Sequence, residues 1–381
     1  MVYNGFMNQT DKEYLTVTRR KLHALAELSG EEHKTSAFIV DELKSFGFKP
    51  KTVGTGVYCD VGKGPRLALR ADIDALPIKE DVVFTGVDFA AEGCVMHACG
   101  HDGHTANLLN VARMIGPKSD IPLRFIFQFG EEGIGGSEAM IEGGVLEDVE
   151  EIYAIHMCPE LDEGKIGYTY GAMFAGCVEF DVEFKGVSAH CATPEKGADA
   201  VRASIYAANK AFDAAKKHNL LINLGKIGGG AARNIIADRC LSAYTLRFYD
   251  MAKSEAFIME LERALIEADE TFGTEHNLIT SAVYPPLINH ALCVDKVRYL
   301  MGDIAVPTEP RYTAEDFSNY INVVPGAIFW LGTKKSDGRY SVPLHSEKFG
   351  FDESALNLGT ELFLKLIDAH AAAHGRGHGK K

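Results

Sequence analysis

Met96-His97-Ala98-Cys99-Gly100-His101-Asp102-Gly103-His104 packs three imidazoles, a thiol and a carboxylate into nine residues. Imidazole and thiolate suit zinc, iron, cobalt or nickel better than calcium or magnesium. A single His or Cys here would usually be a satisfied core residue, but their joint occurrence favours a metal site. Gly100 and Gly103 allow a tight fold of the backbone, so that Cys99 and His101 can face one ion. The sequence therefore predicts a metal centre in this stretch.

Two carboxylates follow a predicted buried strand in Arg70-Ala71-Asp72-Ile73-Asp74-Ala75-Leu76-Pro77. Residues Arg66 to Leu69 have the apolar character of a strand, which runs out into a loop that the proline stops. In an open α/β sheet, ligands bind at the carboxyl ends of the strands. Asp72 and Asp74 are therefore placed for chemistry, and the alternative is that both are solvated loop acids.

A second pair of acids follows a stronger strand signal. Leu123 to Phe129 is a nearly continuous apolar run, as expected for a central strand buried on both faces, and Gly130-Glu131-Glu132-Gly133 comes next. Adjacent carboxylates repel each other unless a cation lies between them. One could bind the metal while its neighbour accepts a proton from water. The alternative is a surface turn that happens to carry two acids.

Two further histidines follow predicted strands. The apolar segment Ile152 to Ile155 ends in His156, and Pro343-Leu344-His345-Ser346 follows a strand-like segment, Ala327 to Leu331. Helical spacing of apolar residues separates these strands from one another. The pattern predicts an α/β fold with a mostly parallel sheet, helices around it and a site along one edge.

Residues 168–284 have a different character. Strands and two long helices alternate there as in an α+β unit with two helices on an antiparallel sheet, inserted between the two parts of the metal-binding domain, residues 1–167 and 285–381. Such an insertion commonly acts as a lid. Its polar residues of interest are His190, Asn234 and Arg247. The alternation from Val178 to Phe184 predicts a half-exposed strand whose free edge pairs with a second copy, giving a homodimer.

Composition narrows the function classes. The chain has 381 residues, of which 46% are hydrophobic and 24% are charged, with a net charge of -14. This balance argues against nucleic-acid binding. No apolar run reaches the roughly 20 residues that span a bilayer, Met1 to Arg20 lacks signal-peptide character, and eight scattered cysteines suit free thiols, so we expect a cytoplasmic protein without membrane contact. The tail from His374 to Lys381 is expected to be disordered and solubilising, and the alternative is that it captures metal weakly.

Together these motifs resemble, over essentially the whole chain, the dinuclear metallopeptidases of the aminoacylase and carboxypeptidase family, in the amidohydrolase branch. That branch includes hippurate hydrolases, N-acetyl-diaminopimelate deacetylases, N-acetylcysteine deacetylases and auxin-conjugate hydrolases. The resemblance rests on the following residues: Arg19-Arg20-Lys21-Leu22-His23, Arg70 to Pro77, Met96 to His104, Glu131-Glu132-Gly133, His156 with Pro159, Ala314-Glu315-Asp316-Phe317 and Leu344-His345-Ser346.

The resemblance implies a role for each candidate. It implies two divalent metal ions, zinc or manganese with nickel or cobalt as substitutes, and a ferredoxin-like fold for the lid and dimerisation domain. Glu131 would be the general base, and Asp72 would orient a metal ligand. His190 would reach the oxyanion, in its own subunit or in a partner, and Asn234 and Arg247 would meet the substrate carboxylate. The implied metal ligands are Cys99, His101, Glu132, His156 and His345.

The predicted function is that of a metal-dependent amidohydrolase that removes an acyl group, with acetyl expected, from a small N-acyl-L-amino acid. A metallo-carboxypeptidase or dipeptidase is the alternative within enzymes, and a non-catalytic ligand-binding relative is the alternative outside them. An intact Glu131 argues against the binding protein, which needs no base beside its metal. Gln128-Phe129-Gly130, where many relatives have Gln-Pro-Ala, and the residues around His190 depart from the family pattern. These departures concern substrate preference.

Overall fold

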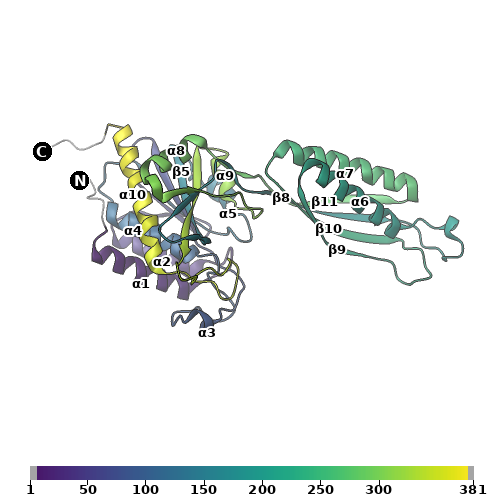
Figure 1. The fold of residues 1–381 in the computed structure, drawn as a ribbon, viewed down its shortest axis with the longest axis horizontal. Coiled ribbons are helices and arrows are strands. Elements are labelled where there is room, and N and C mark those ends of the chain that lie inside the picture. The colour runs from purple at the N-terminus through teal and green to yellow at the C-terminus, as the bar shows by residue number, and fades with distance from the viewer. Residues whose placement is uncertain (1–6, 376–381) are drawn as a thin grey trace. The chain divides into compact units, whose positions relative to one another are not determined.

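The computed structural model describes residues 7–375, which form two compact units (Figure 1). The first unit contains Met1–Gly171, Ile288–Glu309 and Asn319–Lys381, and the second contains Ala172–Leu287 and Pro310–Ser318. Residues 310–318 were predicted to lie in the metal-binding domain. They belong instead to the second unit, because the backbone N–H of Ala175 donates to the carbonyls of Arg311 and Thr313.

The first unit is built on an eight-stranded mixed sheet with the order β1-β2-β4-β3-β5-β14-β6-β13. Its centre is parallel: β3 pairs with β4 and with β5, and β5 pairs with β14. The predicted α/β fold with a mostly parallel sheet is thereby confirmed. The strands are β1 Lys51–Val53, β2 Gly56–Val61, β3 Arg66–Asp72, β4 Leu123–Gln128, β5 Val149–Asp162, β6 Ile166–Tyr168, β13 Ala305–Pro307 and β14 Gly326–Lys334.

Helices surround this sheet (Figure 1). Helix α4 contacts β3, α1 and α10, so it lies in the layer directly against the central strands. The helices are α1 Gln9–Leu25, α2 His33–Ser45, α3 Val82–Thr85, α4 His101–Ile115, α5 Gly136–Glu142, α8 Ala291–Met301, α9 Phe317–Ile321 and α10 Leu356–Ala373. Short strands β7 Gly171–Phe174 and β12 Leu287–Asn289 lie near the points where the chain passes between the units.

Local sequence explains the central elements. All six residues of β4 are buried, as expected for a strand covered on both faces. Helix α1 begins with a capping box, in which Asn8 and Asp11 each accept a hydrogen bond from the other's backbone N–H. The Gly100 backbone, with φ of 87°, precedes α4. Gly100 is thus in the left-handed conformation that glycine adopts most readily.

The second unit is a four-stranded antiparallel sheet with the order β11-β8-β10-β9, and α6 and α7 lie on the same side of it (Figure 1). The β-α-β-β-α-β succession is that of a ferredoxin-like unit. Alternate residues of β8, among them Phe180 and Val182, share a core with alanines of α6 and with Phe257 of α7. The elements are β8 Gly176–Lys185, α6 Ala200–His218, β9 Leu221–Gly229, β10 Arg239–Phe248, α7 Met251–Phe272 and β11 Glu275–Tyr284.

The prediction that the strand from Val178 to Phe184 has a free edge is wrong. This strand, β8, pairs with β10 on one side and with β11 on the other. Its alternation reflects one face packed on the helices and one face turned away from them, which a central strand shares with an edge strand. Among the described strands of this sheet, β9 and β11 are at the edges.

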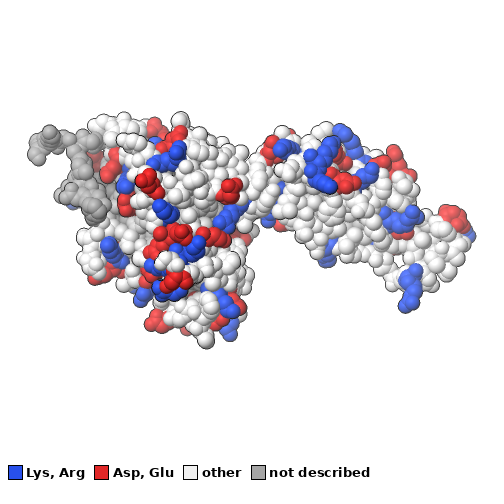
Figure 2. Space-filling view, viewed as in Figure 1, with Lys and Arg blue, Asp and Glu red and all other residues white. Residues whose placement is uncertain are grey.

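The charged side chains and the helices bear on two expectations from the composition, which concern a basic surface and a membrane-spanning helix. On the face shown in Figure 2, basic and acidic side chains are interspersed, and no continuous basic area is visible among the described residues. None of the helices formed within residues 7–375 is long and apolar enough to cross a bilayer. The eight cysteines all lie in the described part of the chain as free thiols.

Truncation of the core of the second unit should destabilise it strongly. Phe257 is fully buried and its ring centroid lies 6.3 Å from that of Phe180. We expect Phe257→Ala to lower the free energy of unfolding by about 3–5 kcal/mol, because it leaves a cavity in the only helix-covered face of the sheet. Urea denaturation followed by circular dichroism measures this change. On the same helix, Met259→Ala should cost less than about 0.5 kcal/mol, because Met259 is 55% exposed.

Candidate metal centre

The five predicted metal ligands all lie in the first unit, and the fold brings them together from four separate segments. Cys99 precedes α4, and His101 is the first residue of this helix. Glu132 lies in the turn after β4. His156 lies inside β5, which continues beyond the predicted strand end because β14 pairs with it as far as Asp162. The fifth, His345, follows β14.

The ligand atoms form two overlapping groups of three, one of Cys99, His101 and His156 and one of Cys99, Glu132 and His345. Within each group the atoms lie within 4.8 Å of one another. The Cys99 Sγ is 3.5 Å from Nε2 of His156, and Nε2 of His345 is 3.1 Å from Oε1 of Glu132. Two neighbouring positions that share a ligand residue are the arrangement that a dinuclear centre requires.

Unsatisfied buried atoms support this interpretation. His101 Nε2 is buried without a hydrogen-bond partner, and it lies 3.8 Å from Glu132 Oε1, which has an ion-pair contact with His345 but no hydrogen bond. Buried polar atoms are normally paired, and a metal ion would satisfy both. The donor set of imidazole, thiolate and carboxylate fits zinc and its neighbours, so the residues present fit the group that the sequence analysis expects.

The electrostatics of the centre also favour a cation. Burial alone would lower the pKa of His101, but Asp72, Asp74 and Glu132 raise it to about 10. Burial, with the carboxylates of Glu132, Glu131 and Asp72, raises the pKa of the Cys99 thiol well above its usual value. The carboxylates thus hold a proton on His101 and on Cys99 in the metal-free chain. A divalent ion would replace both protons.

Two backbone conformations position the ligands. A Cβ on Gly100 would come within 2.7 Å of Met157 Cγ, and its φ of 87° disfavours other residues, so this glycine lets Cys99 and His101 turn to one side. His345 has a φ of 62°, which is uncommon outside glycine, and its backbone N–H donates to Ala98 O over 2.9 Å. Strain of this kind is typical of functional sites.

Asp74, and not Asp72, orients His101. Nδ1 of His101 lies 3.1 Å from Asp74 Oδ1 and 3.0 Å from Asp74 O, which leaves Nε2 for the metal. The role predicted for Asp72 therefore falls to its neighbour two residues along. Asp72 Oδ1 lies 2.6 Å from Nδ1 of His104, and its Oδ2 accepts from Arg70 over 2.7 Å. Asp72 is 3.8 Å from His101 Nε2, so its charge still reaches the centre.

A buried carboxylate that sequence reasoning missed supports the turn of Glu131 and Glu132. Glu32, fully buried, accepts hydrogen bonds from the N–H groups of Gly130 and Gly30, each over 2.9 Å, and from Thr55 Oγ1 over 2.6 Å. The Glu132 N–H donates to Asp74 Oδ2 over 2.8 Å. The turn is thus fixed from both sides. Glu32 precedes α2 as its N-cap, and no local pattern shows that it reaches residue 130.

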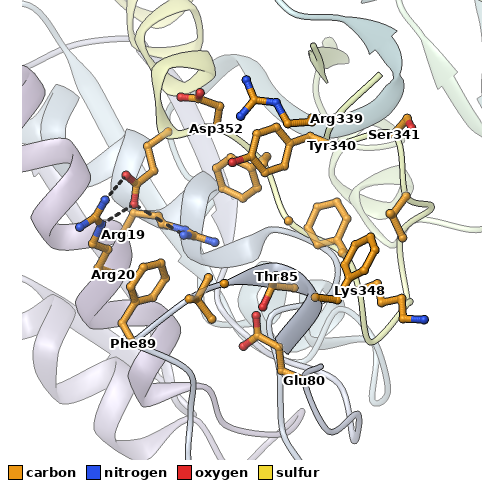
Figure 3. Close-up of a pocket in the computed structure, with 18 of the residues that line it drawn as sticks. Arg19, Arg20, Glu80, Thr85, Phe89, Arg339, Tyr340, Ser341, Lys348 and Asp352 are labelled. Atoms are coloured by element: carbon orange, nitrogen blue, oxygen red, sulfur yellow. Dashed lines mark hydrogen bonds and ion pairs between the residues drawn. The ribbon is translucent and has the colours of Figure 1, made fainter. Parts of the chain in front are cut away.

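The Arg19-Arg20-Lys21-Leu22-His23 motif holds the residue next to His101. Arg19 Nε and His23 Nδ1 each lie 2.8 Å from Asp102 Oδ2, and His23 Nε2 lies 3.0 Å from Glu80 Oε2. Arg19 and Arg20 also border a cavity of about 940 Å³, and dashed lines in Figure 3 join them to the carboxylate of Glu353. No candidate metal ligand lines this cavity. The motif therefore supports the start of α4 through Asp102 and does not contact the candidate metal ligands through this cavity.

The remaining candidates, His190, Asn234 and Arg247, lie in the second unit and do not all come together there. His190 forms a β-bridge with Ile235, and the N–H of Cys191 donates to Asn234 O over 3.0 Å, so His190 and Asn234 are neighbours. Both are exposed. Arg247 pairs with Cys177 at one end of the β8–β10 ladder. Lys185 lies at the opposite end of this ladder, and the loop with His190 follows it. Asn234 therefore lies beside His190, whereas Arg247, which was predicted to meet the same substrate carboxylate as Asn234, lies at the other end of the ladder.

The sequence and the fold match known proteins. A family model described as peptidase family M20/M25/M40 matches residues 68–369. The chain is 32% identical over 364 residues to the N-acetyl-L-cysteine deacetylase of Bacillus subtilis, covering 91% of this chain and 86% of that one. It is 31% identical over 369 residues to thermostable carboxypeptidase 1 of Saccharolobus solfataricus, covering 91% and 93%. A Bacillus subtilis crystal structure described as a dinuclear metal binding peptidase from the M20 family superposes with a TM-score of 0.82 at 27% identity, covering 94% and 98%.

The buried network behind the metal centre should make stability depend on pH. Burial alone would lower the pKa of His23, but Asp102 and Glu80 raise it above 6.5 overall. The folded chain thus binds this proton more tightly, so its stabilisation is complete below pH 6.5 and is lost as the pH rises through the folded-state pKa. Urea denaturation of the chelator-treated protein should show a steeper loss of unfolding free energy above this pH in wild type than in His23→Gln. Equal slopes would contradict the assignment.

Proposed function

Because the chain belongs to peptidase family M20/M25/M40, we propose that it is a metal-dependent amidohydrolase that removes an acyl group, acetyl first of all, from an N-acyl-L-amino acid. The observation that carries this proposal is the group formed by His101, Glu131 and Glu132, whose ligand atoms lie within 4.8 Å of one another. One carboxylate can bind metal there while the other remains beside it as a base. A protein that only bound its ligand would have no use for the second one.

The ligands of the two divalent ions would be Cys99, His101, Glu132, His156 and His345, with zinc or manganese as the metals. Burial and the neighbouring His104 lower the pKa of His156 well below its usual value, so this imidazole is neutral, as a ligand must be. Bound metal ions supply a Lewis acid that makes water acidic near neutral pH and compensates the charge that develops on the amide oxygen.

The proton transfers then fall to Glu131. Neutral water attacks an amide only slowly. A base must therefore remove a proton from the water as its oxygen forms a bond with the carbonyl carbon. The Glu131 carboxylate accepts this proton and returns it to the amide nitrogen, and the carbon–nitrogen bond breaks to release the amine. Glu32 keeps the turn that carries Glu131 in place, so that neither transfer requires the backbone to move.

We propose that His190, Asn234 and Arg247 of the second unit also take part in the reaction. We assign His190 to the carbonyl oxygen, where an imidazole N–H can donate to the developing negative charge. Asn234 lies beside His190, so it acts at the same place. Arg247, at the other end of the ladder, is assigned to the substrate carboxylate by its charge.

The same unit is proposed to form a homodimer through β9. An edge strand leaves one row of backbone groups unpaired, and β9 contains no proline and a single charged residue, Lys226. Leu221 and Ile227 of this strand are exposed. His190 follows the far end of β8, about 33 Å along this strand from where the chain enters the unit. We therefore assign His190 to the metal centre of the partner subunit.

Replacement of each of the two glutamates by glutamine should separate the effect on hydrolysis from the effect on metal binding. We expect Glu131→Gln to abolish hydrolysis, by at least about 100-fold in kcat, while it keeps its metal, because the amide cannot accept the proton. Glu132→Gln should lose metal as well as activity. Metal content by atomic emission and amine release from N-acetyl amino acids measure the two effects. Loss of metal in Glu131→Gln alone would mean that the roles are reversed.

A substrate panel tests the reaction class. Chelated protein should be inactive and should recover on addition of zinc or manganese, with faster amine release from N-acetyl and N-benzoyl amino acids than from dipeptides. Relatives with both deacetylase and carboxypeptidase names make dipeptides the necessary comparison. Faster hydrolysis of dipeptides would move the assignment to a carboxypeptidase or dipeptidase. No activity with metal bound would favour a ligand-binding protein.

Complementation tests the assignment of His190. His190→Ala and Glu131→Gln should each be inactive, but a mixture of the two, after exchange of subunits, should hydrolyse substrate. In the mixed dimer, one centre receives an intact Glu131 from its own chain and an intact His190 from its partner. Light scattering should show the mass of two chains for both variants. A mixed dimer without activity would place His190 in its own subunit, and a monomer would exclude the partner arrangement.

A further inference from the structure

A second group of metal-capable residues lies where α10 ends. Glu150, His370 and His374 each offer one ligand atom, and these atoms lie within 4.8 Å of one another. His370 and His374 are four residues apart, so they share one face of the helix end, and their ring centroids are 4.3 Å apart. Glu150 is the second residue of β5, and its Oε2 lies 2.9 Å from Nε2 of His374.

His370 has the arrangement of a metal-binding histidine. It is only 5% exposed, and its Nε2 is buried without a hydrogen-bond partner. The ring hydrogen-bonds to the backbone of Pro65, and because proline has no N–H, the ring donates to the Pro65 carbonyl. Nδ1 is then the donor, which leaves a lone pair on Nε2. A backbone carbonyl that fixes the tautomer in this way is typical of histidines that bind metal.

His374 and Glu150 complete the group. Nδ1 of His374 lies 3.0 Å from the carbonyl oxygen of His370, so this nitrogen is the donor. Nε2 of the neutral ring then faces the Glu150 carboxylate, and two acceptors 2.9 Å apart require a proton or a cation between them. Both side chains are partly exposed, so both can adjust to an ion while His370 stays fixed.

We propose that Glu150, His370 and His374 form a third metal site that takes Zn²⁺ or a similar borderline ion such as Ni²⁺ or Co²⁺. Two imidazoles and one carboxylate suit these ions, and a water molecule completes a tetrahedral shell. Glu150 precedes His156 by six residues along β5, which corresponds to about 20 Å, so this ion is separate from the catalytic pair.

The third ion has a structural role. It joins the end of α10 to the beginning of β5, two elements distant in the sequence. Helix α10 packs on α4, whose Asn107 donates to Leu356 O over 3.0 Å at the start of α10. The ion therefore supports the helix layer behind the catalytic centre without touching the substrate.

The test is the zinc stoichiometry of the full-length protein. After chelation, equilibrium dialysis against a fixed free Zn²⁺ concentration and atomic emission should find one equivalent more per chain in wild type than in His374→Ala or Glu150→Gln. The matched control is His218→Ala, which removes an imidazole 3.0 Å from Glu260 Oε1 in the second unit and should leave the stoichiometry of wild type. In wild type, and not in the two site variants, the extra equivalent should also raise the thermal midpoint.

Two outcomes would overturn the proposal. Equal zinc content in wild type, His374→Ala and Glu150→Gln would show that His374 and Glu150 form an ion pair only. Loss of the extra equivalent on deletion of residues 376–381, but not in Glu150→Gln, would place the ion on the tail, which lies outside the described residues. All these variants should keep the hydrolytic activity of wild type, because none of the changed residues belongs to the catalytic centre.

Discussion

The mutual repulsion of buried carboxylates at the carboxyl ends of β3 and β4 is the constraint on which the first unit depends. Asp72 ends one strand and Asp74 follows it, and the half-buried Glu131 and Glu132 follow the neighbouring strand, so the parallel pairing of these strands concentrates negative charge at one edge of the sheet. Arg70 compensates part of it through Asp72. The rest raises the pKa of His101 and of Cys99, because negative charge at this edge of the sheet attracts cations, whether protons or a divalent ion.

The surrounding structure holds these charges at fixed positions. Glu32 fixes the turn of the two glutamates, Asp74 fixes the ring of His101, and the network of Arg19, His23 and Asp102 fixes the first turn of α4. Each of these contacts joins segments that are far apart in the chain. A metal centre built in this way has its geometry before metal binds, so that little reorganisation is required when the ion enters.

The second unit divides its polar residues between its two ends. His190 and Asn234 share one end of the antiparallel ladder, and Arg247 lies at the other. A rigid sheet of this kind keeps the two sets apart, so they cannot act on the same atom of a small substrate within one copy of the unit. β9 lies at an edge of this sheet, and it is the strand through which we propose that a second copy pairs.

The sequence by itself determined which side chains are candidates for metal binding and the kind of fold that holds them. Apolar runs of strand length that end in Asp72, Glu131 and His156 imply a parallel sheet with a site at one edge, because successive strands in such folds end on the same side. The concentration of Cys99 and His101 beside glycines implied metal for a similarly local reason: donor type and backbone freedom are properties of single residues.

Only the tertiary structure decided which of these residues meet. Asp72 and Asp74 are equivalent in the sequence, and the packing of α4 on β3 places Asp74 against His101 and Asp72 against His104. The alternation of apolar and polar residues along β8 is compatible with a strand at an edge and with a strand between two others. The strand order of the sheet places β8 between β11 and β10. The contacts of Glu32 with Gly130 and of His370 with Pro65 leave no local pattern at all. Periodicity reports which face of an element is buried, whereas partners distant in the sequence are chosen by the order of strands and the packing of loops.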